Sequence, residues 1–174
     1  MLKEQLTSFL DLSLCDSEAT YNRYLERLKH GNYTGDENPL DHFCVYFLPF
    51  NPQTKKVFIT HHKKSGLWLT PGGHVDKDEG VLQALYREMR EELGLVDFFP
   101  QPPKPFLFTV TDITNETQIC RTHYDTWFLL PTDGSQFKID PSEYFDALWL
   151  TIPEARKIIT DPNNLKALEI IEKK

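Results

Sequence analysis

The stretch GHVDKDEGVLQALYREMREELGL, residues 73–95, predicts the helix around which the rest of the chain is organised. From Glu79 to Leu93 the apolar residues recur at steps of three and four, which predicts one helix face buried against a core. A glycine turn at residues 72–73 precedes this helix, and Gly94 predicts its end. The residues of the predicted buried face are Leu82, Leu85, Tyr86, Met89 and Leu93.

Three carboxylates lie beside this apolar face. At about 100° per residue, Glu88, Glu91 and Glu92 fall within roughly a 100° arc of the helix. Like charges at such spacing destabilise a helix by a few tenths of a kcal/mol per pair, so helix propensity does not explain the cluster. A hard cation does, because Mg²⁺ binds carboxylate oxygens together with waters and substrate phosphates. We therefore predict a divalent-metal site, with a solvated acidic helix face as the alternative.

The same stretch resembles a known motif, the Nudix box. Its pattern is Gly-x5-Glu-x7-Arg-Glu-U-x-Glu-Glu-x-Gly-U, in which U is a bulky aliphatic residue. A chance match at a given start is on the order of one in a billion from ordinary residue frequencies. The preceding WLTPG, residues 68–72, is similar to the entry strand and turn of the family. The matching positions are Gly73, Glu79, Arg87, Glu88, Met89, Glu91, Glu92, Gly94 and Leu95.

The resemblance to the Nudix (MutT-like) hydrolase family implies a metal site and a reaction. It implies Mg²⁺, with Mn²⁺ able to substitute, bound by Glu88, Glu91, Glu92 and the carbonyl of Gly72. The implied catalytic residues are Glu91, Glu92 and Arg87, with Glu91 the first choice for general base and Glu92 the second. Gly73 and Glu79 are expected to orient the site, and Arg87 to pair with Glu79 and Glu91.

Residues outside the box are candidates for substrate binding. His74 follows the glycine turn and is placed to hydrogen-bond a phosphate, with a backbone-satisfied neutral ring as the alternative. Strand alternation predicts Arg121 and His123 on one side of a strand. Glu143 lies in a tract before Trp149 that resembles one from which some family members recruit a further acid. The histidines show no paired ligand spacing, so no zinc site is predicted.

Composition bounds the class of protein. The chain has 174 residues and is 40% hydrophobic, which suits one domain with its own core. Its net charge of −7 disfavours a nucleic-acid surface but not a small nucleotide held through a metal. Neither a signal peptide nor an apolar run of membrane-spanning length is evident. The widely spaced Cys15, Cys44 and Cys120 are expected to be reduced thiols, so we predict a cytoplasmic protein without membrane or nucleic-acid partners.

The pattern along the chain predicts an α/β fold. We expect a helical extension at 1–35, packed on a hydrolase domain at 36–174. Within the extension, Tyr21 and Tyr24 are expected to pack in a core or dimer contact rather than form a recognition surface. By resemblance, the architecture is a Nudix-type α/β/α sandwich with a mixed sheet, and a homodimer is common in the family. Predicted strands are 42–48, 56–61, 67–70, 106–113, 120–130 and 144–150, with a turn at 114–117. Predicted helices are 2–10, one through Leu28 after the capping candidates Asp16 and Ser17, 79–93, 152–159 and one starting at 162.

These patterns lead to one hypothesis and two alternatives. The hypothesis is a Mg²⁺-dependent hydrolase that cleaves a diphosphate linkage in a nucleoside diphosphate derivative or a related pyrophosphate by water attack at phosphorus. The first alternative is a Nudix-fold ligand-sensing or protein-binding module without catalysis. The second, a prenyl diphosphate isomerase, requires a catalytic cysteine, for which Cys44 is the candidate.

Overall fold

The computed structural model describes residues 1–114, 116 and 118–173. The predicted turn at 114–117 therefore lies partly outside the described residues, at positions 115 and 117. The chain forms two compact units: the first comprises residues 1–46, 73–85 and 101–128, and the second comprises 47–72, 86–100 and 129–174.

The order of elements confirms a mixed sheet accompanied by helices. The described sheet has the order β3-β2-β1-β6-β5, with β4 paired to β1 and β7 paired to β2. The pairs β1–β2, β2–β3, β2–β7 and β5–β6 are antiparallel. The strands are β1 (Asp41–Asn51), β2 (Lys56–His62), β3 (Trp68–Leu69), β4 (Gly72–His74), β5 (Leu107–Asp112), β6 (Thr122–Pro131) and β7 (Tyr144–Thr151). The helices are α1 (Leu2–Phe9), a 3-10 turn η1 (Leu12–Leu14), α2 (Glu18–Arg27), α3 (Val81–Leu93), α4 (Ile152–Ile158) and α5 (Pro162–Glu172).

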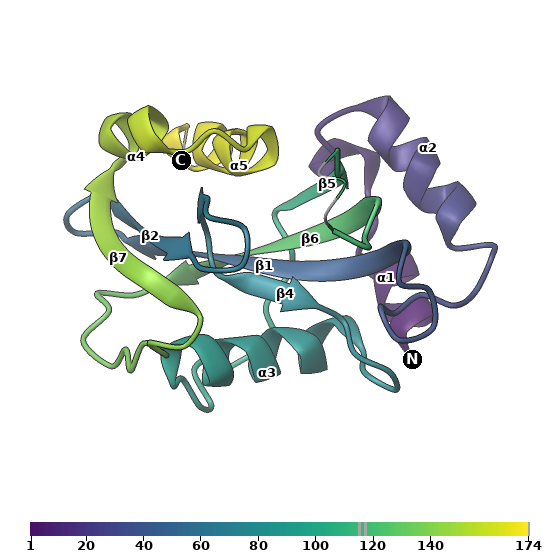
Figure 1. Ribbon diagram of the computed structural model, residues 1–174, viewed down its shortest axis with the longest axis horizontal. Helices are drawn as coiled ribbons and strands as arrows, with labels where there is room; N and C mark the ends of the chain where they lie inside the picture. The colour runs from purple at the N-terminus through teal and green to yellow at the C-terminus, as the bar shows by residue number, and fades with distance from the viewer. Residues whose placement is uncertain (115, 117, 174) are drawn as a thin grey trace. The chain divides into compact units, whose positions relative to one another are not determined.

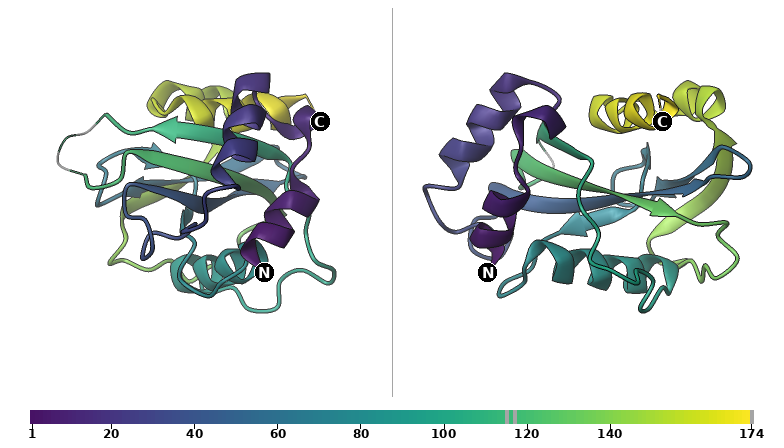
Figure 2. Two further views of the ribbon diagram at one scale, coloured as in Figure 1. Left: turned by 90° about the vertical axis from the view of Figure 1, so that its right-hand side faces the viewer. Right: turned by 180° about the vertical axis from the view of Figure 1, so that it is seen from behind.

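In the first unit, helix α2 packs on β5 and β6 (Figure 2). Helix α2 is capped at its N-terminus by Ser17, whose side chain accepts a hydrogen bond from the N–H of Thr20. Tyr24 on this helix is fully buried, and its ring meets those of Phe43, Phe108 and Tyr124 at centroid distances of 5.4–5.7 Å. The predicted core role of Tyr24 is confirmed. The domain boundary after residue 35 stays a prediction.

The second unit forms an α/β/α arrangement by itself. Figure 1 shows α4 and α5 on one face of β2 and β7, and the C-terminal part of α3 on the other face. Helix α5 begins at Asp161, which accepts a hydrogen bond from the N–H of Asn164. The Asn164 side chain in turn accepts a 2.8 Å hydrogen bond from the N–H of Thr70, which ties the helix layer to the chain after β3. The predicted sandwich is confirmed.

Several boundaries differ from the sequence-based expectation. Strand β1 continues through Pro49 to Asn51, because proline fits an extended backbone and the pairing with β2 extends to the end of the strand. Gly72 and Gly73 belong to strand β4 rather than to a turn. Helix α3 begins at Val81 rather than at residue 79, and β6 begins two residues later than predicted. Among the described residues, no helix is both long and apolar enough to cross a membrane.

Candidate active site

Helix α3 carries the centre of the site. Its buried apolar residues are Val81, Ala84, Leu85, Met89 and Leu93. Tyr86, predicted to be buried, is 38% exposed, because the buried face is rotated toward Ala84 and Glu88. The helix ends at Gly94, whose φ of +67° is the left-handed conformation that glycine adopts without strain. The N–H of Leu95 then donates to the carbonyl of Met89 and closes the helix end.

The three box glutamates differ sharply in exposure. Glu88 and Glu92 are buried, with 9% and 5% of their surface exposed, whereas the Glu91 side chain is 54% exposed. Burying two carboxylates on an apolar helix face is costly unless each is paired with a cation or hydrogen-bonded. The cluster is therefore not a solvated acidic face.

Arg87 holds two of these glutamates. Its Nη1 donates to Oε1 of Glu88 over 2.6 Å and to Oε2 of Glu91 over 3.2 Å. The expected pairing with Glu91 is confirmed, and Glu88 is a partner that the sequence did not indicate. The Glu79 carboxylate accepts a 3.1 Å hydrogen bond from the N–H of Asp76, and its expected role toward Arg87 stays a prediction.

Glu92 lies in an unusual electrostatic environment. Burial raises the pKa of its carboxyl well above the ordinary value, and the charges of Glu88 and Glu143 raise this pKa further. Hydrogen bonding by the Tyr144 hydroxyl and by the N–H of Gly72 acts in the opposite direction and lowers this pKa. Within the described part of the chain, the buried Oε2 of Glu92 accepts no hydrogen bond. A carboxylate oxygen left in this way suits a cation ligand, so the donor set fits a hard divalent metal.

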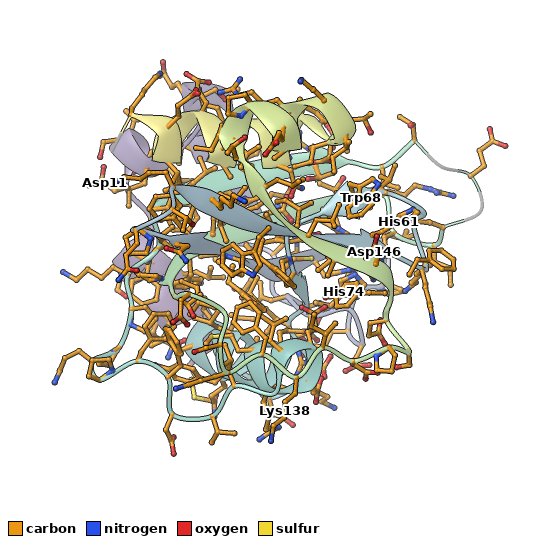
Figure 3. The ribbon with its side chains drawn as sticks, turned by 90° about the vertical axis from the view of Figure 1, so that its left-hand side faces the viewer. Asp11, His61, Trp68, His74, Lys138 and Asp146 are labelled. Carbon is orange, nitrogen blue, oxygen red and sulfur yellow. The ribbon has the colours of Figure 1, made fainter. Side chains whose placement is uncertain are left out.

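Two backbone segments lie beside Glu92, one at Gly72 and one in the loop before β7. Gly72 has a φ of +147°, a conformation that side-chain-bearing residues rarely adopt. The loop before β7 is fixed to the end of α3, because the N–H groups of Lys138 and Asp140 donate to the carbonyls of Leu93 and Glu92. Lys138 is labelled in Figure 3. This loop leads to Glu143 and Tyr144 and explains how they reach the electrostatic surroundings of Glu92.

Two residues near the glutamates were not singled out in the sequence. Tyr144 is buried, and burial together with the charge of Glu92 raises its pKa, so the hydroxyl stays protonated. Nε2 of His62 lies 3.8 Å from Oε2 of Glu143. Burial lowers the pKa of His62, while the charge of Glu143 opposes that shift. The proximity of Tyr144 to Glu143 in the chain was the only available signal.

An aromatic group lies at the ends of β2, β3 and β7 in the second unit. The rings of His61 and Trp68 are nearly parallel, at a centroid distance of 4.9 Å, and Phe145 lies 5.1 Å from His61. Asp146 is paired in register with His61 across β2 and β7. Figure 3 shows His61, Trp68 and Asp146 together. Flat, partly exposed rings of this kind can stack on a nucleobase.

The remaining candidates lie in the first unit. His74 and His123 are brought together, with ring centroids 4.9 Å apart. Arg121 directly precedes β6, is exposed and donates to the carbonyl of Gln118, and its expected place on the same side as His123 stays a prediction. The three cysteines are present as thiols, as expected; Cys44 is buried, whereas Cys15 and Cys120 are half-buried.

An α/β/α sandwich whose helix presents clustered carboxylates offers the oxygen donors that hard divalent cations prefer. The chain belongs to the NUDIX family: the model of the NUDIX domain matches residues 40–170. The family expected from the box is therefore confirmed.

Curated relatives and solved structures agree with this assignment. An RNA pyrophosphohydrolase of Xanthomonas axonopodis pv. citri is 31% identical over 100 residues, covering 52% of this chain and 49% of the relative. An 8-oxo-dGTP diphosphatase of Buchnera aphidicola is 49% identical over 43 residues, covering 24% of this chain and 35% of the relative. This chain thus spans half or less of the length of these relatives. The E. coli dihydroneopterin triphosphate pyrophosphohydrolase shares the fold, with a TM-score of 0.63 at 20% identity over 73% of this chain and 92% of its own.

Proposed function

We propose that this chain is a Mg²⁺-dependent pyrophosphohydrolase that cleaves a diphosphate linkage in a nucleoside diphosphate derivative or a related pyrophosphate. The observation that carries the proposal is the glutamate cluster of α3, above all the buried Oε2 of Glu92. The names of the curated relatives, a pyrophosphohydrolase and a diphosphatase, support the same bond type. Magnesium, when bound, neutralises phosphoryl oxygens and lowers the pKa of bound water.

The chain's own residues divide the work. Glu88, Glu91, Glu92 and the Gly72 carbonyl supply hard oxygen ligands. Arg87 is a positioning residue, because its guanidinium fixes the Glu88 and Glu91 carboxylates relative to each other. Glu91 is the first choice for general base, since its exposed side chain is accessible to a water molecule. Glu92 remains the second choice. Mn²⁺ should substitute for Mg²⁺ because both prefer oxygen ligands.

Substrate selection is assigned to residues outside the helix. In the second unit, Glu143 with His62, and the aromatic group of His61, Trp68 and Phe145, are the candidates to contact the substrate. The exposed Arg121 of the first unit stays a candidate for a phosphate. The net charge of −7 favours a small anionic substrate bound through metal over a long nucleic acid.

A substrate panel tests the proposal. Nucleoside triphosphates, nucleotide sugars, dinucleoside polyphosphates and 5′-triphosphorylated RNA are incubated with Mg²⁺ or Mn²⁺ in ¹⁸O water, and both products are identified. Glu91→Gln should abolish turnover while circular dichroism stays unchanged, and Glu18→Gln, an exposed acid on α2, serves as the control. Undiminished turnover of Glu91→Gln would overturn the site. Binding without hydrolysis across the panel would favour the ligand-sensing module instead.

A further inference from the structure

The first unit contains a second cluster of metal-ligating side chains, made of nitrogen and sulfur donors. His42 at the start of β1, His74 at the end of β4, Cys120 before β6 and His123 within β6 each place one ligand atom within 4.8 Å of the others. The ring centroids of the three histidines are 4.3–4.9 Å apart. His42 is 1% exposed and His123 is 9% exposed, whereas His74 and Cys120 are half-buried.

We propose that these four residues bind a zinc ion. Zinc takes four ligands in a tetrahedron, and its bonds to histidine nitrogen and cysteine sulfur place the ligand atoms about 3.4–3.6 Å apart. The observed spread of up to 4.8 Å needs only small side-chain rotations to reach that geometry. Three imidazoles and one thiolate select zinc over Mg²⁺, which prefers oxygen. This site is therefore chemically distinct from the glutamate cluster of α3.

Neighbouring groups orient the ring of His42 and lie close to the ring of His123. Nδ1 of the buried His42 lies 3.0 Å from the carbonyl oxygen of Asn38. In a neutral ring, Nδ1 donates that hydrogen bond and Nε2 keeps the lone pair that a metal requires, an arrangement found in most zinc sites. A carboxylate oxygen of the buried Asp125 lies within 4.8 Å of a ring nitrogen of His123. The hydroxyls of Thr109 and Thr111 hold this carboxyl group through hydrogen bonds of 3.2 and 2.6 Å, so its position beside the cluster is fixed.

Four protein ligands complete the tetrahedron and indicate a structural site rather than a catalytic one. Within the first unit, the metal joins the segment before β6 to β1 and β4. This assignment replaces the sequence-based expectation that His74 and His123 bind substrate. The competing explanation is a cluster of neutral, hydrogen-bonded histidines without metal.

Metal analysis of the full chain, purified without a histidine tag, tests the proposal. We expect about one zinc per chain, as for a closed four-ligand site. Cys120→Ser and His123→Asn should lose the zinc, whereas Cys15→Ser and the exposed His30→Asn should retain it. Glu91→Gln should also retain it, which separates this site from the proposed catalytic one. Failure of the zinc proposal would then leave the hydrolase proposal standing, and the converse also holds.

Cobalt substitution provides a readout that does not depend on activity. Co²⁺ in the wild-type site should show a thiolate-to-metal charge-transfer absorption that is absent from Cys120→Ser. Circular dichroism confirms that the variant is folded, and Cys120 is only half-buried, so this substitution disturbs packing little. A wild-type protein that takes up neither zinc nor cobalt at this site would overturn the proposal. Full zinc retention in both Cys120→Ser and His123→Asn would do so as well.

Discussion

The glutamate cluster of α3 and the histidine–cysteine cluster of the first unit are built in opposite ways. Glu88, Glu91 and Glu92 come from successive turns of one helix, and an arginine of the same helix orients two of them. The second cluster draws its four side chains from three distant segments of the chain. One site is fixed by local geometry and the other by the pairing of strands.

The two clusters also differ in donor chemistry and access. The glutamates offer hard oxygens, and Glu91 opens to solvent, as expected where water and a phosphate must enter. The histidines and Cys120 offer softer donors, of which His42 and His123 are buried and His74 and Cys120 are half-buried. The comparison predicts a double dissociation, in which activity depends on the first cluster and zinc content depends on the second.

The largest expected effect is on activity. Glu88→Gln removes a proposed metal ligand together with the partner of Arg87 at 2.6 Å. Removing an outer-shell partner typically costs 10–100-fold, so losing the ligand itself should lower kcat/KM by more than about 100-fold. Steady-state kinetics over a Mg²⁺ titration measures the effect, with Glu18→Gln as the control. Zinc content should stay at the wild-type level, and a parallel loss of zinc would break the dissociation.

Arg87→Gln should have a smaller effect on the same cluster. The arginine contacts Glu88 and Glu91 rather than the reacting atoms, so its loss should lower kcat/KM by roughly 10–100-fold and raise the Mg²⁺ concentration needed for half-maximal rate. Arg90→Gln, on the exposed side of the same helix, is the matched control. A purely structural role would lower stability and leave the Mg²⁺ dependence unchanged. Raising Mg²⁺ should therefore partly rescue Arg87→Gln, and absence of rescue argues against positioning.

These differences explain how much the sequence could predict. The box helix, its end at Gly94 and the glutamates were predictable because ligands three and four residues apart on one helix need no tertiary information. The exposure of Tyr86 and the burial of Glu88 were not, because the rotation of a helix on its sheet depends on tertiary packing. The contact of Arg87 with Glu88, in addition to the expected Glu91, was not predicted for the same reason.

The histidine–cysteine cluster could not be predicted from spacing alone. His42 and His74 converge only because β4 pairs with β1, and no local pattern encodes that pairing. The single sequence signal was Cys120-x2-His123, which has the spacing of a ligand pair but lacks a second pair nearby. Helix α2 presents the opposite case, because the Ser17 cap and the helical spacing up to Tyr24 were sufficient.

Cys120→Ser tests the histidine–cysteine cluster through its effect on thermal stability. If free zinc exceeds its Kd by 100-fold, binding stabilises the folded chain by about 2.7 kcal/mol. For a chain of this size, the variant should therefore melt about 5–10 °C lower than the zinc-bound wild type. A chelator should lower the wild-type Tm to that of the variant and leave the variant unchanged. Mg²⁺-dependent turnover below the Tm should persist, and its loss would show that the clusters are coupled.

The smallest expected effect is on the pH dependence of stability, to which His62, the histidine near the glutamates, and the histidines of the second cluster should contribute separately. Burial lowers the pKa of His62 below the ordinary 6.5, so the folded chain binds this proton less readily than the unfolded chain. The contribution of His62 to stability is complete above pH 6.5 and is lost as the pH falls through the lower folded-state value. His62→Gln should flatten the pH dependence of the unfolding free energy in that window, measured by denaturant titration with chelator present. An unchanged slope would show that a group other than His62 causes the pH dependence.

The same titration without chelator reports on the second cluster. A further loss of stability at low pH that disappears in Cys120→Ser would show that protons displace zinc from that cluster.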